Sequence, residues 1–181
     1  MSRLIAFGCS VTFGTGLDDC LPDKTTRVAC KIPSSFAWPT VLANQLGLEC
    51  VNMGQSGISN KGIWFNIINF KYMPDDIVFV MWTNKDRTCV LEQNRTINIG
   101  AWASDPLSKW YYKMMYNEHD HAVDTDLRIA HATTFLTEKN ITCINLSLDP
   151  IQRHISTHAV FLDIVPLRDF AMPFGLAPDK N

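Results

Sequence analysis

A serine flanked by glycines follows the first apolar run of the chain. Ser10 lies in the segment FGCSVTFGTG, residues 7–16, where the strand-like run RLIAFG ends. Ligands of open α/β sheets bind outside the carboxyl ends of the strands, so a hydroxyl at this position is placed to react with one. The glycine spacing, with no lysine after it, matches neither the phosphate loop GxxxxGKS/T nor the dinucleotide fingerprint GxGxxG. The segment therefore favours a nucleophile over a phosphate site.

Two later segments bring hydrogen-bond donors to the same predicted edge of the sheet. Residues 52–60, NMGQSGISN, contain Gly57, and residues 82–87, WTNKDR, contain Asn84. A hydroxyl, a glycine amide and a carboxamide are the parts of an acyl-transfer site, in which the donors stabilise the oxyanion of the tetrahedral intermediate. A purely structural interpretation is also open: Ser10 and Asn84 as helix caps and Gly57 as a turn residue.

In their order, these segments resemble three of the four sequence blocks of the SGNH (GDSL-type) hydrolase family. The resemblance covers residues 4–86 and, more weakly, the C-terminal end. It implies Ser10 as the nucleophile, with its own amide as an oxyanion donor, and Gly57 and Asn84 as the other donors. It also implies hydrolysis of a small acyl or acetyl ester, which could be carried on a carbohydrate, through an acyl-serine and without a cofactor.

The chain departs from the family pattern in two places. Cys9 stands where the family usually has aspartate before the serine, and the fourth block supplies Asp179 but has Asn181 near the position of the family's histidine. A serine hydroxyl is a poor nucleophile without a base. Three explanations are open: the chain is cut before the histidine, another histidine substitutes, or the protein is non-catalytic. Truncation or degeneracy is favoured, because the five histidines lie in helical or insertion segments: His119, His121, His131, His154 and His158.

The competing hypothesis is an SGNH-fold binding or structural protein. The compact chain, Cys9 and the missing histidine resemble hydrolase-like proteins carried by large tailed phages, in which a role in the virion is conceivable. The expected location is the cytoplasm, or the host cytoplasm or virion if the protein is viral. The expected partner is a small-molecule or carbohydrate ester substrate, with no nucleic acid and no membrane, and a homo-oligomer is allowed.

Composition limits the remaining possibilities. With 181 residues and 46% hydrophobic content, the chain is expected to form a single domain over residues 1–181. A formal net charge of -2 gives no general attraction to nucleic acid or to an anionic membrane. No apolar run approaches the ~20 residues of a membrane span, and the six cysteines form no CxxC pair, which indicates reduced thiols.

Short apolar runs alternate with helical patterns, which predicts an α/β fold. The runs resemble strands buried on both faces of a parallel sheet. The predicted strands are residues 3–8, 49–54, 75–82 and 140–147, and the predicted helices are 34–47, 61–72 and 122–140. The helix at 34–47 is expected to begin at Ser34 or Ser35 and to keep Pro39 in its first turn. We expect three α/β/α layers around a mostly parallel sheet of four or five strands, similar to the flavodoxin-like order of the SGNH family.

Two regions allow more than one interpretation. The segment 83–119 is an insertion rich in aromatic residues, which could line a substrate cleft, stack on sugar rings, close over the core or form a subunit contact; core or contact is favoured. Its aromatic residues are Trp102, Trp110, Tyr111, Tyr112 and Tyr116. Residues 157–167 could be a last strand or a buried helix.

A polar cluster at 118–126 resembles a set of metal ligands. It consists of His119, Asp120, His121, Asp124 and Asp126. Acidic residues in the first turn of a helix explain the same pattern, because they interact favourably with the helix dipole. We favour this second interpretation and expect no metal.

Overall fold

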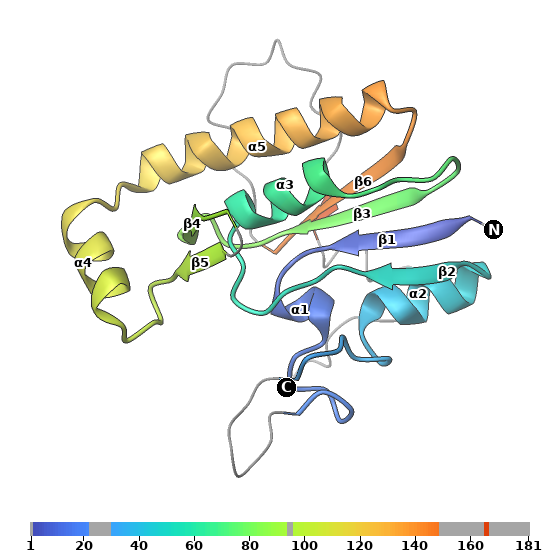
Figure 1. The fold of residues 1–181 in the computed structure, drawn as a ribbon, viewed down its shortest axis with the longest axis horizontal. Coiled ribbons are helices and arrows are strands. Elements are labelled where there is room, and N and C mark those ends of the chain that lie inside the picture. Colours follow the sequence, from blue (N-terminus) through green and yellow to red (C-terminus); the bar gives the residue numbers. More distant parts are fainter. Residues whose placement is uncertain (1, 22–29, 94–95, 149–164, 167–181) are drawn as a thin grey trace.

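The computed structural model describes residues 2–21, 30–93, 96–148 and 165–166. Within these residues a parallel sheet has the strand order β2-β1-β3-β6-β7 (Figure 1). Its strands are β1 Arg3–Phe7, β2 Glu49–Asn52, β3 Ile77–Trp82, β6 Thr142–Ser147 and β7 Val165–Pro166. The predicted α/β class and flavodoxin-like order are confirmed. The rest of the ambiguous segment 157–167 lies outside the described residues.

Apolar side chains on both faces of β1 explain why this strand is central. Ile5 and Phe7 belong to one buried cluster, and Leu4 and Ala6 belong to the other. Successive side chains of a strand point to opposite faces, so an unbroken apolar run is what a strand covered on both sides requires. β3 follows the same rule, and the two strands pair in parallel from Leu4 opposite Ile77 onward.

Helices cover both faces of the sheet, as the three-layer prediction requires. α3 (Asn60–Asn69) and α5 (Glu118–Glu138) pack together and contribute to the cluster that contains Phe7 (Figure 1). α2 (Trp38–Leu46) packs through Leu42 on the opposite face. The segments of the candidate site follow the carboxyl ends of β1, β2 and β3.

The predicted start of the helix at 34–47 is wrong. α2 begins at Trp38 with Ala37 as its N-cap, and Pro39 lies in its first turn as expected. The hydroxyl of Ser34 instead donates to the Asp19 carboxylate, and the Ser35 amide donates to the same carboxylate at 2.7 Å. Two apolar residues of the segment 34–47 do not contribute to the core, because they are 61% and 52% exposed: Phe36 and Leu46.

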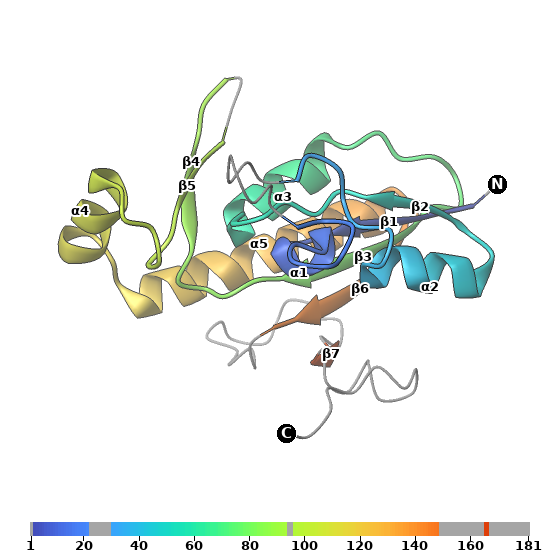
Figure 2. The same cartoon turned by 90° about the horizontal axis from the view of Figure 1, so that it is seen from below.

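The segment 83–119 contains regular structure of its own. β4 (Thr88–Leu91) and β5 (Thr96–Ile99) form an antiparallel hairpin, and α4 (Pro106–Met114) follows. Figure 2 shows the hairpin standing out from the sheet, with α4 beside it. Trp102 and Trp110 remain more than half exposed, so within the described residues they do not close over the core.

A buried ion pair joins the start of the sheet to the turn before β3. The Arg3 guanidinium donates to both carboxylate oxygens of Asp76, at 2.9 and 2.7 Å, and the Met73 amide donates to the same carboxylate at 2.8 Å. Burial by itself would raise the pKa of Asp76, but the hydrogen bond from Arg3 and the Met73 amide outweigh it and hold this pKa below its usual value.

Replacing Asp76 by asparagine is expected to lower the free energy of unfolding by about 3 kcal/mol, because it leaves the Arg3 charge without its partner. The pKa of Asp76 is lowered on folding, so its contribution is complete above the unfolded value of about 3.9 and is lost as the pH falls below it. Urea unfolding at neutral and acidic pH measures both effects. Asp75→Asn, at the exposed neighbouring position, is the matched control and should change neither.

Candidate functional site

Ser10 is the first residue of the one-turn helix α1 (Ser10–Phe13), directly after the central strand β1. Its side chain is partly exposed, whereas Cys9 is only 1% exposed and belongs to the core. Cys9 occupies the N-cap position and makes no side-chain capping bond, so Ser10 is not the cap of this helix. The left-handed Gly14 ends the helix after one turn. The fold therefore leaves Ser10 partly exposed and buries the neighbouring Cys9.

Two glycines allow the loops at this edge to approach α1 closely. A Cβ atom at Gly8 would lie 2.1 Å from the hydroxyl oxygen of Thr12 and 3.1 Å from the carbonyl oxygen of Met81. A Cβ atom at Gly54 would lie 2.6 Å from the amide nitrogen of Phe13. The distances of 2.1 and 2.6 Å are far below a normal contact, so glycine at positions 8 and 54 permits this packing.

Hydrogen bonds fasten the loop after β2 to α1. The Gln55 amide donates to the Gly8 carbonyl at 2.9 Å, and the Asn52 side chain donates to the Thr12 carbonyl at 2.7 Å. The hydroxyls of Thr15 and Ser56 also bond to each other. The loop that carries Gly57 is thus held against the turn that carries Ser10.

Asn60 fastens the loop after β3 to the same assembly. Its side-chain amide donates to the Thr83 carbonyl at 2.9 Å, and its side-chain oxygen accepts from the Thr83 amide at 2.8 Å. Asn60 is buried and is the first residue of α3, while Thr83 directly precedes Asn84. Sequence reasoning gave Asn60 no role, although it is the last residue of the segment NMGQSGISN. This pair of bonds fixes the Asn84 loop relative to the Gly57 loop.

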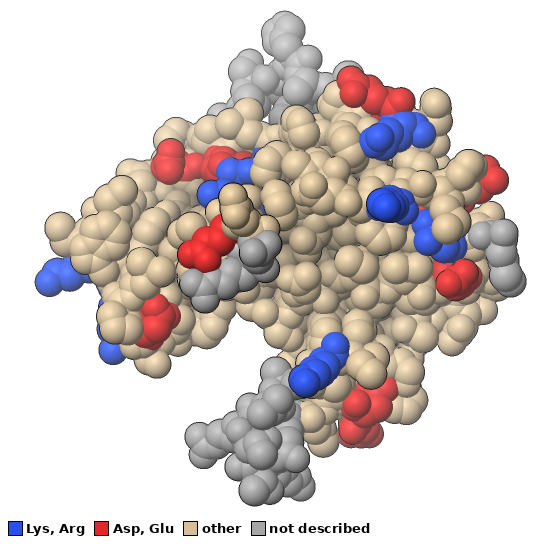
Figure 3. Space-filling view, viewed as in Figure 1, with Lys and Arg blue, Asp and Glu red and all other residues tan. Residues whose placement is uncertain are grey.

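The three predicted residues of the first three blocks therefore lie on segments that follow the carboxyl ends of three parallel strands. Gly57 has φ +77°, in the left-handed region that favours glycine, and Asn84 is partly buried. β2 and β3 flank β1 on opposite sides, so the strand order reverses at β1, which is where ligands bind in such sheets. Figure 3 shows the surface hollowed between α1 and the region of α4. Asp179 lies outside the described residues.

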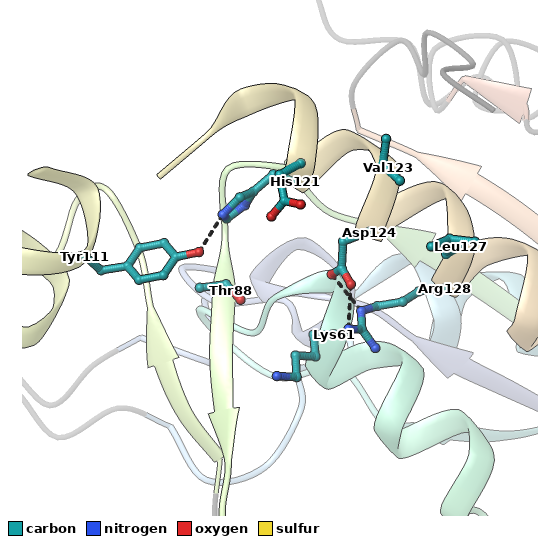
Figure 4. Close-up of a pocket in the computed structure, with 9 residues that line it drawn as sticks. Lys61, Thr88, Tyr111, His121, Val123, Asp124, Leu127 and Arg128 are labelled. Carbon is teal, nitrogen blue, oxygen red and sulfur yellow. Dashed lines mark hydrogen bonds and ion pairs between the residues drawn. The ribbon is translucent and has the colours of Figure 1, made fainter. Parts of the chain in front are cut away.

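His121 is buried, and its ring is engaged at both nitrogens. Nδ1 lies 2.9 Å from the carbonyl oxygen of Lys85, and Nε2 lies 2.7 Å from the hydroxyl of Tyr111 (Figure 4). A carbonyl oxygen only accepts, so Nδ1 donates to it, and Nε2 shares the second hydrogen bond with the tyrosine hydroxyl. Although His121 lies in a helix, it contacts the loop after β3. It holds that loop and has no free nitrogen for Ser10.

The other histidines give no base beside Ser10 within the described residues. His131 accepts a hydrogen bond at Nδ1 from the Trp64 indole at 2.9 Å, on the helix-covered face of the sheet. His119 lies in the exposed first turn of α5, and its side chain takes part in a further contact. His154 and His158 lie outside the described residues.

The polar cluster at 118–126 begins a helix. Asn117 caps α5 by accepting from the Asp120 amide at 3.0 Å, and Asp124 pairs with Arg128 at 2.6 Å. Among the residues described, no three or more His, Cys, Asp or Glu side chains are grouped to hold a metal ion.

A pocket of about 290 Å³ opens beside this helix start and includes Lys61 (Figure 4). Its charged residues have both signs.

The buried thiols are poor candidates for covalent chemistry. Burial raises the pKa of Cys143 to about 12 and also raises the pKa of Cys89. All six cysteines are free in the structure. A thiol with a raised pKa stays protonated at neutral pH, and the thiolate is the reactive form.

Comparisons with known proteins give structural likeness only. No protein-family model and no curated protein matches the sequence. A member of the lipolytic G-D-S-L family from Veillonella parvula DSM 2008 has a TM-score of 0.42 at 14% identity, over 81% of this chain and 57% of that one. AlinE4, an SGNH-hydrolase family esterase, has a TM-score of 0.43 at 17% identity, over 81% of this chain and 58% of that one. The chain thus spans less than two thirds of the length of these structures.

Among the described helices, none has the length and apolar character of a membrane span.

Proposed function

We propose that the protein is a serine ester hydrolase of the SGNH type with Ser10 as its nucleophile. The observation that carries this proposal is the position of Ser10, partly exposed on a one-turn helix where the strand order reverses. Within the described residues its side-chain oxygen makes no hydrogen bond, so attack on a substrate would break no interaction recorded there. The loops of Gly57 and Asn84, fastened beside it, supply the donors that an acyl transfer needs.

In the proposed reaction the Ser10 oxygen forms a bond to the ester carbonyl carbon. The carbonyl oxygen takes up negative charge and is stabilised by the amides of Ser10 and Gly57 and the side chain of Asn84. Collapse of this intermediate expels the alcohol and leaves an acyl-serine, which water then hydrolyses. The left-handed backbone at Gly57 suits this role, because it turns an amide in a direction that other residues rarely adopt.

The reaction needs a group that takes the Ser10 proton. The rings of His121 and His131 are bonded elsewhere. We assign the acidic member of the proton relay to Asp179, as the family resemblance implies. The proposed substrate class is a small acyl or acetyl ester, including esters carried on carbohydrate.

Labelling with a fluorophosphonate probe tests this proposal. The intact protein is expected to form one phosphonate adduct, and peptide mapping by mass spectrometry should place it on Ser10. The Ser10→Ala variant should stay unlabelled, whereas Ser104→Ala, which removes an exposed hydroxyl from the segment before α4, should label like the parent. An unlabelled parent protein would refute the proposal and favour a binding or structural protein with the same fold.

A further inference from the structure

Arg87 lies at the border of the proposed oxyanion site. Its amide bonds to the Asn84 carbonyl at 3.4 Å, so one tight turn separates it from the proposed donor. Its guanidinium carbon lies 4.5 Å from the centroid of the Trp102 ring. That ring also reaches the Gly57 loop, because a Cβ atom at Gly57 would lie 3.8 Å from it. Trp102 thus lies against both the Arg87 side chain and the Gly57 loop.

The Arg87 charge lacks a carboxylate partner within the described residues. Arg3 is bonded to Asp76 and Arg128 to Asp124, each through two nitrogens of its guanidinium. For Arg87 no such pair exists in that part of the chain, and its Nε atom is buried without a hydrogen-bond acceptor. Arginine stays charged at all physiological pH values, so the cation is permanent. An unpaired, partly buried guanidinium beside a site is suited to bind an anion.

Trp102 holds the guanidinium in place. A Cβ atom at Gly100 would lie 2.2 Å from the Trp102 ring, so the ring rests directly on the backbone of this glycine. Gly100 and Arg87 both lie against the Trp102 ring. We therefore interpret the ring as a surface on which Arg87 stacks, in preference to a surface on which a sugar stacks. Stacking on an aromatic ring restricts the long arginine side chain. The side chain therefore loses less conformational entropy when an anion binds.

We propose that Arg87 binds an anionic oxygen group, a carboxylate or a phosphate, carried by the ester substrate. This inference rests on the proposed function and narrows its substrate class to acidic esters. The planar guanidinium can donate two parallel hydrogen bonds to either group. Because Arg87 follows Asn84 by three residues, the anion would lie close to the ester bond that Ser10 attacks.

The specificity of hydrolysis tests the proposal with two esters that share a leaving group. These are the neutral para-nitrophenyl acetate and the anionic para-nitrophenyl hemisuccinate. Arg87→Gln should lower the ratio of kcat/KM for hemisuccinate to kcat/KM for acetate by about 10- to 100-fold. Arg87→Lys should lower this ratio less, because the positive charge remains although the two parallel N–H donors of the guanidinium are lost. Lys109→Gln removes an exposed positive charge from α4 and should leave the ratio unchanged.

A binding measurement separates this inference from the proposed function. Calorimetry with the Ser10→Ala variant and hemisuccinate needs no catalysis, and adding Arg87→Gln should weaken binding by a similar factor. Competition by succinate or by inorganic phosphate then distinguishes a carboxylate site from a phosphate site. If the enzyme is active and Arg87→Gln leaves the ratio of kcat/KM for hemisuccinate to kcat/KM for acetate unchanged, only the proposal for Arg87 is overturned. An unlabelled protein that binds hemisuccinate through Arg87 overturns the esterase proposal alone, and absence of both signals overturns both.

Discussion

Hydrolysis of para-nitrophenyl acetate is expected to fall by about 10³-fold or more when Ser10 is replaced by alanine. The variant removes the atom that forms the acyl intermediate, so the loss should appear in kcat, and the initial burst of para-nitrophenol should disappear with it. Steady-state and rapid-mixing kinetics on the parent and variant proteins measure both quantities. This is the largest effect that the proposed mechanism predicts.

The loss in Ser10→Ala should not come from unfolding. Within the described residues the Ser10 side-chain oxygen makes no hydrogen bond, and the helix holds Ser10 through its carbonyl, which accepts from the Gly14 and Thr15 amides. The melting temperature should therefore stay close to that of the parent. Ser104→Ala, at an exposed position before α4, provides the matched control and should retain most of the activity. A Ser10→Ala variant that hydrolyses the ester at the parent rate would remove Ser10 from the mechanism.

The fold could be predicted because continuous apolar runs mark the central strands of the sheet in the sequence. A strand buried on both faces needs an unbroken apolar run, and RLIAF and IVFVMW satisfy that condition. Helix boundaries were less predictable, since capping depends on partners that are distant in sequence. Ser34 and Ser35 have the composition of N-caps, but Asp19 binds both of them, and the helix begins four residues after Ser34.

The hairpin at 88–99 shows a second limit. Its strands TCVL and TINI are short and mostly only partly buried, so they lack the continuous apolar pattern that marked the strands of the sheet. The aromatic residues nearby drew attention to the segment without indicating its structure. Periodicity predicts elements that face a core, and this hairpin stands away from the central sheet (Figure 2).

Sequence could predict which residues carry the proposed chemistry, but not what holds them in place. Ser10, Gly57 and Asn84 stand out because each follows a strand, and parallel strands bring their carboxyl ends to one edge. The bonds from Asn60 to Thr83 and the stacking of Arg87 on Trp102 join residues 23 and 15 positions apart in the chain. Such contacts depend on the tertiary structure, and no short sequence motif predicts them. Asp179 stays a prediction.

Replacing Asn84 by alanine is expected to lower kcat by about 10²- to 10³-fold, with a smaller effect on KM. In the proposed mechanism its amide donates to the oxygen that gains negative charge in the transition state, so the bond strengthens as the reaction proceeds. An interaction that forms mainly in the transition state changes kcat, whereas one that binds substrate and transition state equally changes KM. Asn84→Asp should be at least as damaging, because a carboxylate would repel the oxyanion.

The Asn84 result can be separated from a change in loop structure. Thr83, bonded to Asn60 through its backbone, anchors the loop and is untouched by the substitution. Fluorophosphonate labelling of Ser10 should therefore persist in Asn84→Ala at a reduced rate. Asn69→Ala removes an exposed carboxamide that bonds the Phe65 carbonyl on α3 and should leave kcat unchanged. If Asn84→Ala raises KM and leaves kcat unaltered, Asn84 binds the substrate in its ground state, and the oxyanion must be stabilised by the backbone amides alone.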